Sequence, residues 1–181
     1  MTGPPHRIVL VGFMGSGKTT VGAKLARILG WRLEDMDARI SEENGLSVAE
    51  IFGRRGEPFF REEEARVAAA LRGRERLVVA AGGGAFATAA TREALRAGAA
   101  TVWLKCDLET ILARVRLDGS RPLASSRETI VRLLAEREPS YRLADLTVDA
   151  SGRRPEVVAR EIVDCLFAGQ AADGRGGRPN R

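Results

Sequence analysis

One stretch near the start of the chain, residues 8–29, constrains the fold more than any other part of the sequence. An apolar run at 8–11 leads directly into Gly-Phe-Met-Gly-Ser-Gly-Lys-Thr at 12–19, which matches the pattern G-x-x-x-x-G-K-T, and a helical pattern follows. A strand, a glycine-rich turn and a helix in immediate succession distinguish a phosphate-binding loop (P-loop) from a chance match. We expect the helix to run to Leu29 and to stop at Gly30. Its expected apolar face comprises Val21, Leu25, Ile28 and Leu29.

The residue types in this loop suit the binding of nucleotide phosphates. Glycines let backbone N–H groups turn toward phosphate oxygens, and the following helix adds the partial positive charge of its N-terminus. Lys18 is expected to reach the terminal phosphates, and the Thr19 hydroxyl to complete the coordination of Mg²⁺. The alternative is an ordinary glycine-rich turn between a strand and a helix. The candidate nucleotide ligands in the loop are Gly15, Ser16, Gly17, Lys18, Thr19 and Thr20.

Other apolar runs of strand length recur along the chain, with helical patterns in the gaps between them. They lie at residues 77–81, 101–104 and 146–148, and residues 33–37 are expected to form the end of the second strand. Alternation of this kind predicts an α/β fold, with a parallel sheet covered by helices.

Three further helices carry recognisable start signals. Ser47 and Glu50 have the spacing of a capping box, and Asp107 is placed to cap a helix that runs through Ile111 and Leu112. Pro155 suits the first position of a final helix, which we expect to end near residue 167.

Length and composition limit the class of protein. A chain of 181 residues fits one domain, and 44% apolar with 29% charged residues is ordinary for a globular protein. No apolar run approaches the roughly 18 residues that span a bilayer, and residues 1–7 show no signal-peptide pattern, so a cytoplasmic protein that is not in a membrane is expected. Cys106 and Cys165 are too few for a disulfide framework or a thiolate zinc site, and we expect both to be buried or incidental.

The net charge of +5 raises the question of nucleic-acid binding. Only three of the 29 basic residues are lysines, and the arginines are spread among glutamates, as in Arg-Glu-Glu-Glu-Ala-Arg at 61–66. This pattern is typical of a solvated helix face, so no nucleic-acid partner is expected.

Two carboxylates follow the second expected strand. If residues 33–37 are extended, Asp35 and Asp37 point to the same side, at the edge of the sheet where ligands bind in doubly wound folds. One of them could then hold Mg²⁺ through water, while the other orients a substrate hydroxyl for attack. The alternative is that one of them caps the next helix.

Three glycines and one arginine are further candidates. Residues 82–84 are all glycine and come directly after an apolar strand, which predicts a third binding loop, although an ordinary turn is the alternative. Arg121 lies in a polar segment at about residues 116–126 that suits a mobile lid, where it could stabilise a transferring phosphoryl group, although an arginine in a loop is commonly a surface residue. Residues 169–181 are expected to be a disordered tail to a single domain at 1–168.

In this order, these segments resemble the shikimate kinases, which phosphorylate the 3-hydroxyl of shikimate. The resemblance runs from about residue 8 to 166 and includes the P-loop, Asp-Met-Asp at 35–37, the three glycines, Arg-Pro-Leu at 121–123 and Arg-Glu-Pro-Ser-Tyr-Arg at 137–142. It implies a three-layer α/β/α fold of the nucleoside-monophosphate-kinase type, with a five-stranded parallel sheet and a lid. It also implies ATP and shikimate as substrates, Mg²⁺ as cofactor, and a monomer.

The resemblance also assigns roles to residues, with the shikimate-binding region at about 34–64. It implies Lys18, Arg121 and Asp37 as catalytic groups and Thr19 and Asp35 as metal-site residues. Shikimate binding is implied for Asp37, Arg61, Gly82, Gly83, Gly84 and Arg137. Nucleotide contacts beyond the P-loop are implied for Arg114, Arg121, Arg153 and Pro155. The rival functions are a gluconate kinase, an adenylate-kinase-type enzyme and a catalytically silent nucleotide-binding module.

Overall fold

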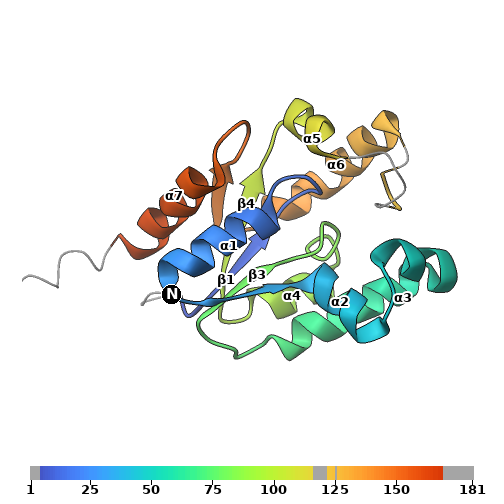
Figure 1. Cartoon of the computed structure of the whole chain (residues 1–181), viewed down its shortest axis with the longest axis horizontal. Helices are drawn as coiled ribbons and strands as arrows, with labels where there is room; N and C mark the ends of the chain where they lie inside the picture. The colour runs from blue at the N-terminus through green and yellow to red at the C-terminus, as the bar shows by residue number, and fades with distance from the viewer. Residues whose placement is uncertain (1–4, 116–121, 125, 169–181) are drawn as a thin grey trace, which may run out of the picture.

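The computed structural model describes residues 5–115, 122–124 and 126–168 (Figure 1). Its strands are β1 (Arg7–Val11), β2 (Arg32–Asp35), β3 (Leu77–Ala80), β4 (Ala100–Lys105) and β5 (Leu146–Asp149). Its helices are α1 (Lys18–Leu29), α2 (Met36–Asn44), α3 (Val48–Ala70), α4 (Ala89–Arg96), α5 (Leu108–Arg114), α6 (Arg127–Tyr141) and α7 (Pro155–Phe167).

The five strands form one parallel sheet in the order β2-β3-β1-β4-β5. All residues of the central strands β1 and β3 are buried, and so are those of β4 except Lys105, whereas the edge strands β2 and β5 are partly exposed. Strands that are apolar on both faces need helices on both sides, which confirms the predicted fold class.

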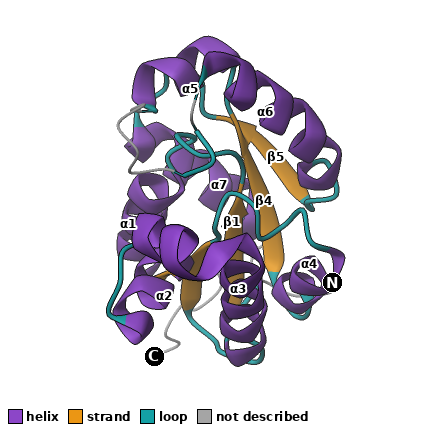
Figure 2. Ribbon diagram, turned by 90° about the vertical axis from the view of Figure 1, so that its right-hand side faces the viewer, coloured by secondary structure: helices purple, strands orange, loops and turns teal. Residues whose placement is uncertain are grey.

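Helices α1 and α7 pack together on one face of the sheet, and α3 and α4 pack together on the other. Figure 1 shows the α2–α3 pair and the α5–α6 pair on opposite sides of the carboxyl end of the sheet, and Figure 2 shows the same arrangement from the side. Loops that follow parallel strands therefore converge between these two pairs, where ligands bind in open α/β sheets.

The predicted helix starts are confirmed. The capping box of Ser47 and Glu50 is complete, the Asp107 carboxylate accepts a hydrogen bond from the Thr110 N–H at 2.7 Å, and Pro155 opens α7. The first helix ends at Gly30, which adopts a left-handed conformation with φ of 65°.

Two details of the predicted elements are wrong. Ile28 was expected on the buried face of α1, but it is 46% exposed because the face against the sheet includes the small residues Gly22 and Ala26. At Gly22 a Cβ would lie 2.9 Å from Leu33 Cδ1, so a larger residue would displace the Leu33 side chain. The second strand ends at Asp35 rather than continuing to residue 37, because α2 begins at Met36.

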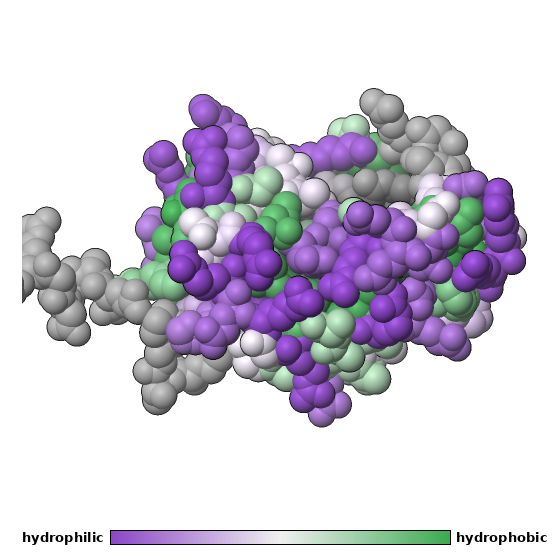
Figure 3. Space-filling view, turned by 60° about the horizontal axis from the view of Figure 1, so that its bottom comes forward, coloured by the Kyte–Doolittle hydropathy of each residue, from purple (hydrophilic) through white to green (hydrophobic). Residues whose placement is uncertain are grey.

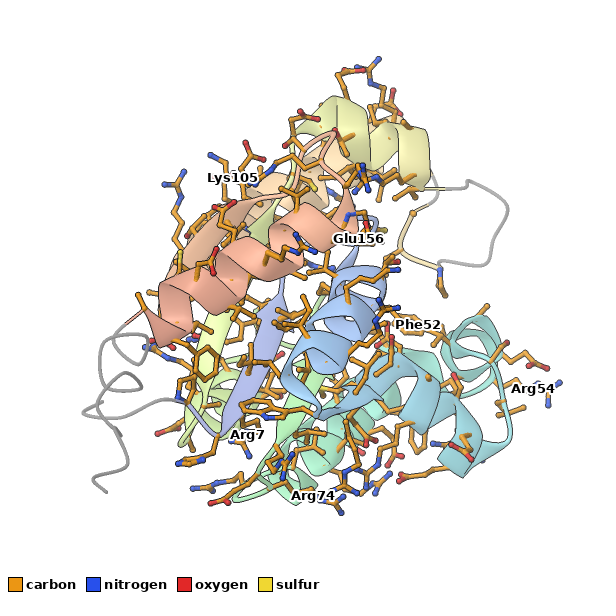
Figure 4. The ribbon with its side chains drawn as sticks, turned by 60° about the vertical axis from the view of Figure 1, so that its left-hand side comes forward. Arg7, Phe52, Arg54, Arg74, Lys105 and Glu156 are labelled. Atoms are coloured by element: carbon orange, nitrogen blue, oxygen red, sulfur yellow. The ribbon has the colours of Figure 1, made fainter. Side chains whose placement is uncertain are left out.

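Helix α3 is bent at Gly56, where φ is 81° and ψ is 168°. The bend separates the turns around Phe52 from the turns around Phe60, and it brings the two rings to 4.9 Å between centroids. In Figure 4, Phe52 is turned toward the body of the protein, whereas Arg54 points outward, and its side chain is 65% exposed. The two parts of α3 therefore present apolar side chains to one region.

The amino end of the sheet is closed by a buried cation. Arg7, at the start of β1 and labelled in Figure 4, donates hydrogen bonds to the carbonyls of Leu71 and Ala97, which end α3 and α4. Burial, with a smaller effect of Arg72, lowers the pKa of Arg7 from its usual value. A positive charge is favourable at these helix C-termini because it faces the negative end of each helix dipole.

The surface is largely hydrophilic in the view of Figure 3, where hydrophobic residues form small groups among charged ones. Pairs such as Arg54–Glu50 and Arg142–Glu138 bridge successive helical turns. Among the described residues, no helix combines the length and the apolar character that crossing a membrane requires. Most of the predicted lid, including Arg121, and the predicted tail at 169–181 lie outside the described residues.

Candidate active site

The P-loop connects β1 to α1 through glycines in conformations that other residues rarely adopt. Gly12, Gly15 and Gly17 have φ values of 141°, 78° and 92°. A Cβ on Gly12 would also lie 2.7 Å from the Leu104 carbonyl oxygen, so the loop can pass close to β4 only with glycine at this position. The loop ends where Lys18 begins α1, which places the helix N-terminus at the cavity described below.

Lys18 lies across the loop. Its Nζ donates hydrogen bonds to the carbonyl oxygens of Gly12 at 2.8 Å and Phe13 at 2.9 Å. These contacts hold the ammonium group at the cavity, where it is available to neutralise phosphate charge.

The two candidate metal-site residues are in direct contact. The Thr19 hydroxyl donates to Asp35 Oδ2 at 2.6 Å, while Asp35 Oδ1 accepts a hydrogen bond from the Ala38 N–H at 3.1 Å. Asp35 therefore caps α2 and also faces the P-loop, so the two readings of its role in the sequence are compatible. No group of three or more His, Cys, Asp or Glu residues that could hold a metal occurs within the described ranges.

A cavity of about 380 Å³ opens over the P-loop. It is lined by Met14, Gly15, Gly17, Lys18, Thr19, Thr20, Asp35, Asp37, Ala80, Ala81, Gly83 and Arg114. A neighbouring cavity of about 210 Å³ is lined by Ser16, Gly17, Thr20, Val21, Arg114, Ala150, Arg153, Pro155 and Val158. The structure thus brings Arg114, Arg153 and Pro155 together beside the P-loop, although they lie far apart in the sequence.

The two arginines that line the 210 Å³ cavity are anchored by backbone carbonyls. Arg114 Nη1 lies 3.3 Å from the Gly15 oxygen, and Arg153 donates to the Asp149 oxygen at 2.7 Å and to Glu161 at 2.5 Å. Cys106 lies beneath this region with its thiol 3.8 Å from the Ser16 oxygen, and burial raises the pKa of the thiol. Of the two cysteines, Cys106 is buried and Cys165 is exposed.

A third cavity, of about 250 Å³ and called the small cavity below, lies on the other side of the P-loop. It is lined by Met14, Asp37, Val48, Phe52, Phe60, Arg61, Glu64, Gly83, Gly84, Pro122, Leu123 and Arg137. Its volume is below the roughly 300–1,000 Å³ of sites for drug-sized ligands, so it suits a small molecule rather than a second nucleotide. The combination of two arginines, two carboxylates and aromatic walls suits a small hydroxylated acid.

The small cavity and the 380 Å³ cavity over the P-loop share Asp37, Gly83 and Met14. Asp37 reaches this position from the first turn of α2, not from an extended strand as the sequence suggested. Alternation along a strand is therefore the wrong reason for its placement, but the carboxylate does lie at the carboxyl end of the sheet.

Glu64 is the functional candidate that the sequence reasoning missed. It was included in a solvated helix face, but its side chain is 1% exposed, and its Oε1 has no hydrogen-bond partner among the described residues. Burial raises the pKa of Glu64 to about 7, with a further rise from Asp37, and the guanidinium groups of Arg61 and Arg137 only partly offset it. The available signal was its helical spacing from Phe60, Val67 and Ala68, which are all buried in α3.

Two arginines flank the small cavity. Arg61 is paired with Glu57 at 2.6 Å and with Glu64, and its side chain is 21% exposed. Arg137, in α6, is 7% exposed, and its guanidinium carbon lies 5.9 Å from the centre of the Phe13 ring. Ion pairs therefore hold Arg61, whereas Arg137 is confined by its burial beside Phe13.

The three glycines after β3 allow close approach to these charged groups. A Cβ on Gly82 would lie 2.6 Å from Asp37 Oδ1, and one on Gly84 would lie 2.6 Å from the Arg61 guanidinium carbon. The Gly83 carbonyl accepts a hydrogen bond of 2.5 Å from the Tyr141 hydroxyl. Of the six predicted substrate-binding residues, five line this one cavity, and Gly82 lies behind it against Glu64 and Asp37.

A P-loop, a nucleotide-sized space and an adjoining cavity for a small acid, on a five-stranded parallel sheet, define the class of P-loop kinases that act on small molecules. Residues 14–167 match the family model described as shikimate kinase. A relative from Moorella thermoacetica named shikimate kinase is 49% identical over 166 residues, which cover 91% of this chain and 96% of the relative. The chain belongs to the shikimate kinase family.

Solved structures agree with this assignment. A shikimate kinase from Acinetobacter baumannii in complex with shikimate matches with a TM-score of 0.87 and 36% identity over 93% of this chain and 96% of the other. A gluconokinase from Sinorhizobium meliloti matches with a TM-score of 0.59 and 20% identity over 91% of this chain and 93% of the other, a likeness that extends to the fold alone.

Proposed function

We propose that this protein transfers the terminal phosphoryl group of ATP to the 3-hydroxyl of shikimate. The observation that carries the proposal is that Asp37 and Gly83 line both the P-loop cavity and the small cavity. A donor phosphate and an acceptor hydroxyl would meet at these residues. Family membership and the shikimate-bound relative support shikimate as the acceptor.

The acceptor is held by charge. We assign Arg61 and Arg137 to the shikimate carboxylate, because guanidinium groups form charge-assisted, potentially bidentate bonds with carboxylates. The ring would lie against Phe52 and Phe60, which line the cavity, with the glycine loop beneath it. A small acid bound this way presents its hydroxyl toward Asp37.

The transfer itself is an in-line displacement. The acceptor oxygen forms a bond to the terminal phosphorus while the bond from phosphorus to the ADP oxygen breaks, and the hydroxyl proton passes to the Asp37 carboxylate. Lys18 and the N–H groups of the P-loop stabilise the charge on the phosphates. Arg121, which lies outside the described residues, stays a predicted catalytic cation.

The oxygen donors of Thr19 and Asp35 suit Mg²⁺, because this ion keeps several waters and binds through few protein ligands, not in a closed protein cage. It would neutralise phosphate charge when bound with ATP.

The assignment of Arg114, Arg153 and Pro155 to the nucleotide base follows from the cavity that they line. Six expectations from the sequence stay predictions: the lid, the tail, the single domain at 1–168, the monomeric state, the cytoplasmic location and the absence of a nucleic-acid partner.

Release of ADP from ATP, measured in a coupled assay with shikimate, gluconate or AMP as acceptor, tests this function. We expect rapid turnover with shikimate and only background with the other two. Turnover with gluconate would transfer the assignment to the sugar-acid kinases, and turnover with AMP to the adenylate-kinase type. ATP binding without turnover on any acceptor would indicate a silent nucleotide-binding module.

A further inference from the structure

Tyr141 is a buried polar residue that the mechanism above does not use. It ends α6, one helical turn after Arg137, and its side chain is fully buried. Its ring packs against Trp103 of β4 with 6.1 Å between centroids, and its hydroxyl reaches the Gly83 carbonyl at 2.5 Å. One side chain therefore joins the helix that carries Arg137 to the middle of the glycine loop.

The glycine loop does not itself use this carbonyl. Ala85 and Ala87 donate backbone hydrogen bonds to the carbonyls of Gly82 and Gly84 at 3.1 Å and 3.0 Å, which closes two successive turns. The Gly83 carbonyl lies between them and accepts from Tyr141 instead. Because glycines have few steric limits, the plane of this peptide unit is otherwise weakly determined.

The orientation of the Gly83 carbonyl determines the orientation of the next N–H group. The structure has no cis peptide bond among its described residues, and in a trans unit the carbonyl of one residue and the N–H of the next point in opposite directions. Tyr141 holds the Gly83 carbonyl toward the core, so the Gly84 N–H points away from the core. Gly84 lines the small cavity and lies against the Arg61 guanidinium.

We infer that Tyr141 is a positioning residue, which orients the Gly84 N–H, beside Arg61 and Arg137, as a third donor to the acid group of the acceptor. The inference rests on the proposed function. It deepens that function by adding a residue that touches no substrate but aligns a backbone donor that does. Preorganised donors increase affinity because less conformational entropy is lost when the ligand binds.

The hydroxyl of Tyr141 is suited to this role over a wide pH range. Burial raises its pKa to about 12, which the nearby Arg137 guanidinium only partly offsets. The group therefore stays protonated and remains a donor in every assay buffer in common use.

Tyr141→Phe removes the hydroxyl, with its bond to the Gly83 carbonyl and its contact with Arg137, and keeps the ring against Trp103. The response of the Gly84 amide, and not the KM alone, therefore separates the two contacts. We expect the KM for shikimate to rise about tenfold, the size of effect that corresponds to partial loss of one hydrogen bond to a charged group, with kcat and the KM for ATP nearly unchanged. In the ¹H–¹⁵N spectrum, shikimate should shift the Gly84 amide of the parent protein strongly and that of the variant less. The matched control is Ile162→Val, which deletes one buried methyl group in α7 at a residue that lines none of the three cavities.

The outcomes separate the inference from the proposed function. A parent protein that does not phosphorylate shikimate overturns both. A parent protein that does so, with a Tyr141→Phe variant whose shikimate KM is unchanged, overturns the inference alone. The inference also fails if the KM for ATP rises equally, or if Ile162→Val shows the same rise in the shikimate KM, because either result would indicate a general loss of stability.

Discussion

The Thr19 hydroxyl donates a hydrogen bond to the Asp35 carboxylate at 2.6 Å, and this contact joins the P-loop to the first turn of α2. The other oxygen of Asp35 caps the helix at the Ala38 N–H. The first turn of the same helix also carries Asp37, which lines the small cavity. One carboxylate therefore links the nucleotide side of the site to the acceptor side.

The two roles of Asp35 can be separated by substitution. Asp35→Asn keeps a good capping side chain but removes the charge, so we expect near-normal thermal stability and a higher requirement for Mg²⁺. Asp35→Ala should show the same metal effect and in addition lose about 1 kcal/mol of unfolding free energy. Denaturant unfolding and Mg²⁺ titration of activity measure the two effects. An unaltered Mg²⁺ requirement in both variants would remove Asp35 from the metal site.

Lys18→Ala should lower kcat by at least about a hundredfold, because a preorganised cation at the transferring phosphate is lost. The variant loses the hydrogen bonds to the carbonyls of Gly12 and Phe13, so its thermal unfolding should be measured beside its activity. Lys24→Ala is the matched control, because Lys24 lies on the same helix and pairs with exposed Glu156 at 2.9 Å. Comparable activity in the Lys18 and Lys24 variants would contradict the assigned role.

Much of the fold could be predicted from the sequence because its signals are local. The P-loop, the capping box at Ser47, the cap at Asp107 and the proline that opens α7 each depend on residues a few positions apart. The boundary between β2 and α2 could not be fixed in the same way. In either an extended or a helical reading, Met36 faces the core and the flanking aspartates do not, so the pattern does not distinguish the two.

The site was predicted mainly through motifs, and the residue that was missed shows the limit of reasoning from charge. A run of arginines and glutamates is usually solvated, and Arg66, with its side chain 49% exposed, follows that rule. Glu64 does not, because α3 turns it inward beside Asp37 and Arg61. Only the tertiary packing of α3 against the glycine loop determines which charges of this run are buried.

Arg61→Lys tests the proposed carboxylate clamp while leaving a positive charge beside Glu64. A lysine cannot form the planar fork of an arginine, so we expect the KM for shikimate to rise about tenfold or more with a smaller change in kcat. Arg54→Lys on the same helix is the control, because the Arg54 side chain is 65% exposed and pairs only with Glu50 in the described ion pairs. Steady-state kinetics with shikimate as the varied substrate measure the effect, and equal KM values for the two variants would exclude the clamp.

Glu64 should make stability depend on pH in a direction opposite to that of most carboxylates. Its pKa in the folded protein is about 7, against an ordinary value of 4.5, so between these values the folded state binds more protons than the unfolded state. The free energy of unfolding should therefore fall as pH rises from 4.5 through 7, by up to about 3 kcal/mol from this group.

Glu64→Gln should remove this contribution, because a neutral amide has no proton to release. Other groups also titrate in this window, so the informative quantity is the difference between parent and variant in denaturant unfolding at a series of pH values. The unfolding free energy of the variant should fall less than that of the parent as pH rises, so the variant should gain stability relative to the parent between pH 5 and pH 8. Glu62→Gln, two residues earlier and on the exposed side of α3, should leave the pH profile of the parent unchanged. Parallel profiles for the parent and Glu64→Gln would show that Glu64 is already ionised at low pH and that its pairing with Arg61 outweighs the cost of its burial.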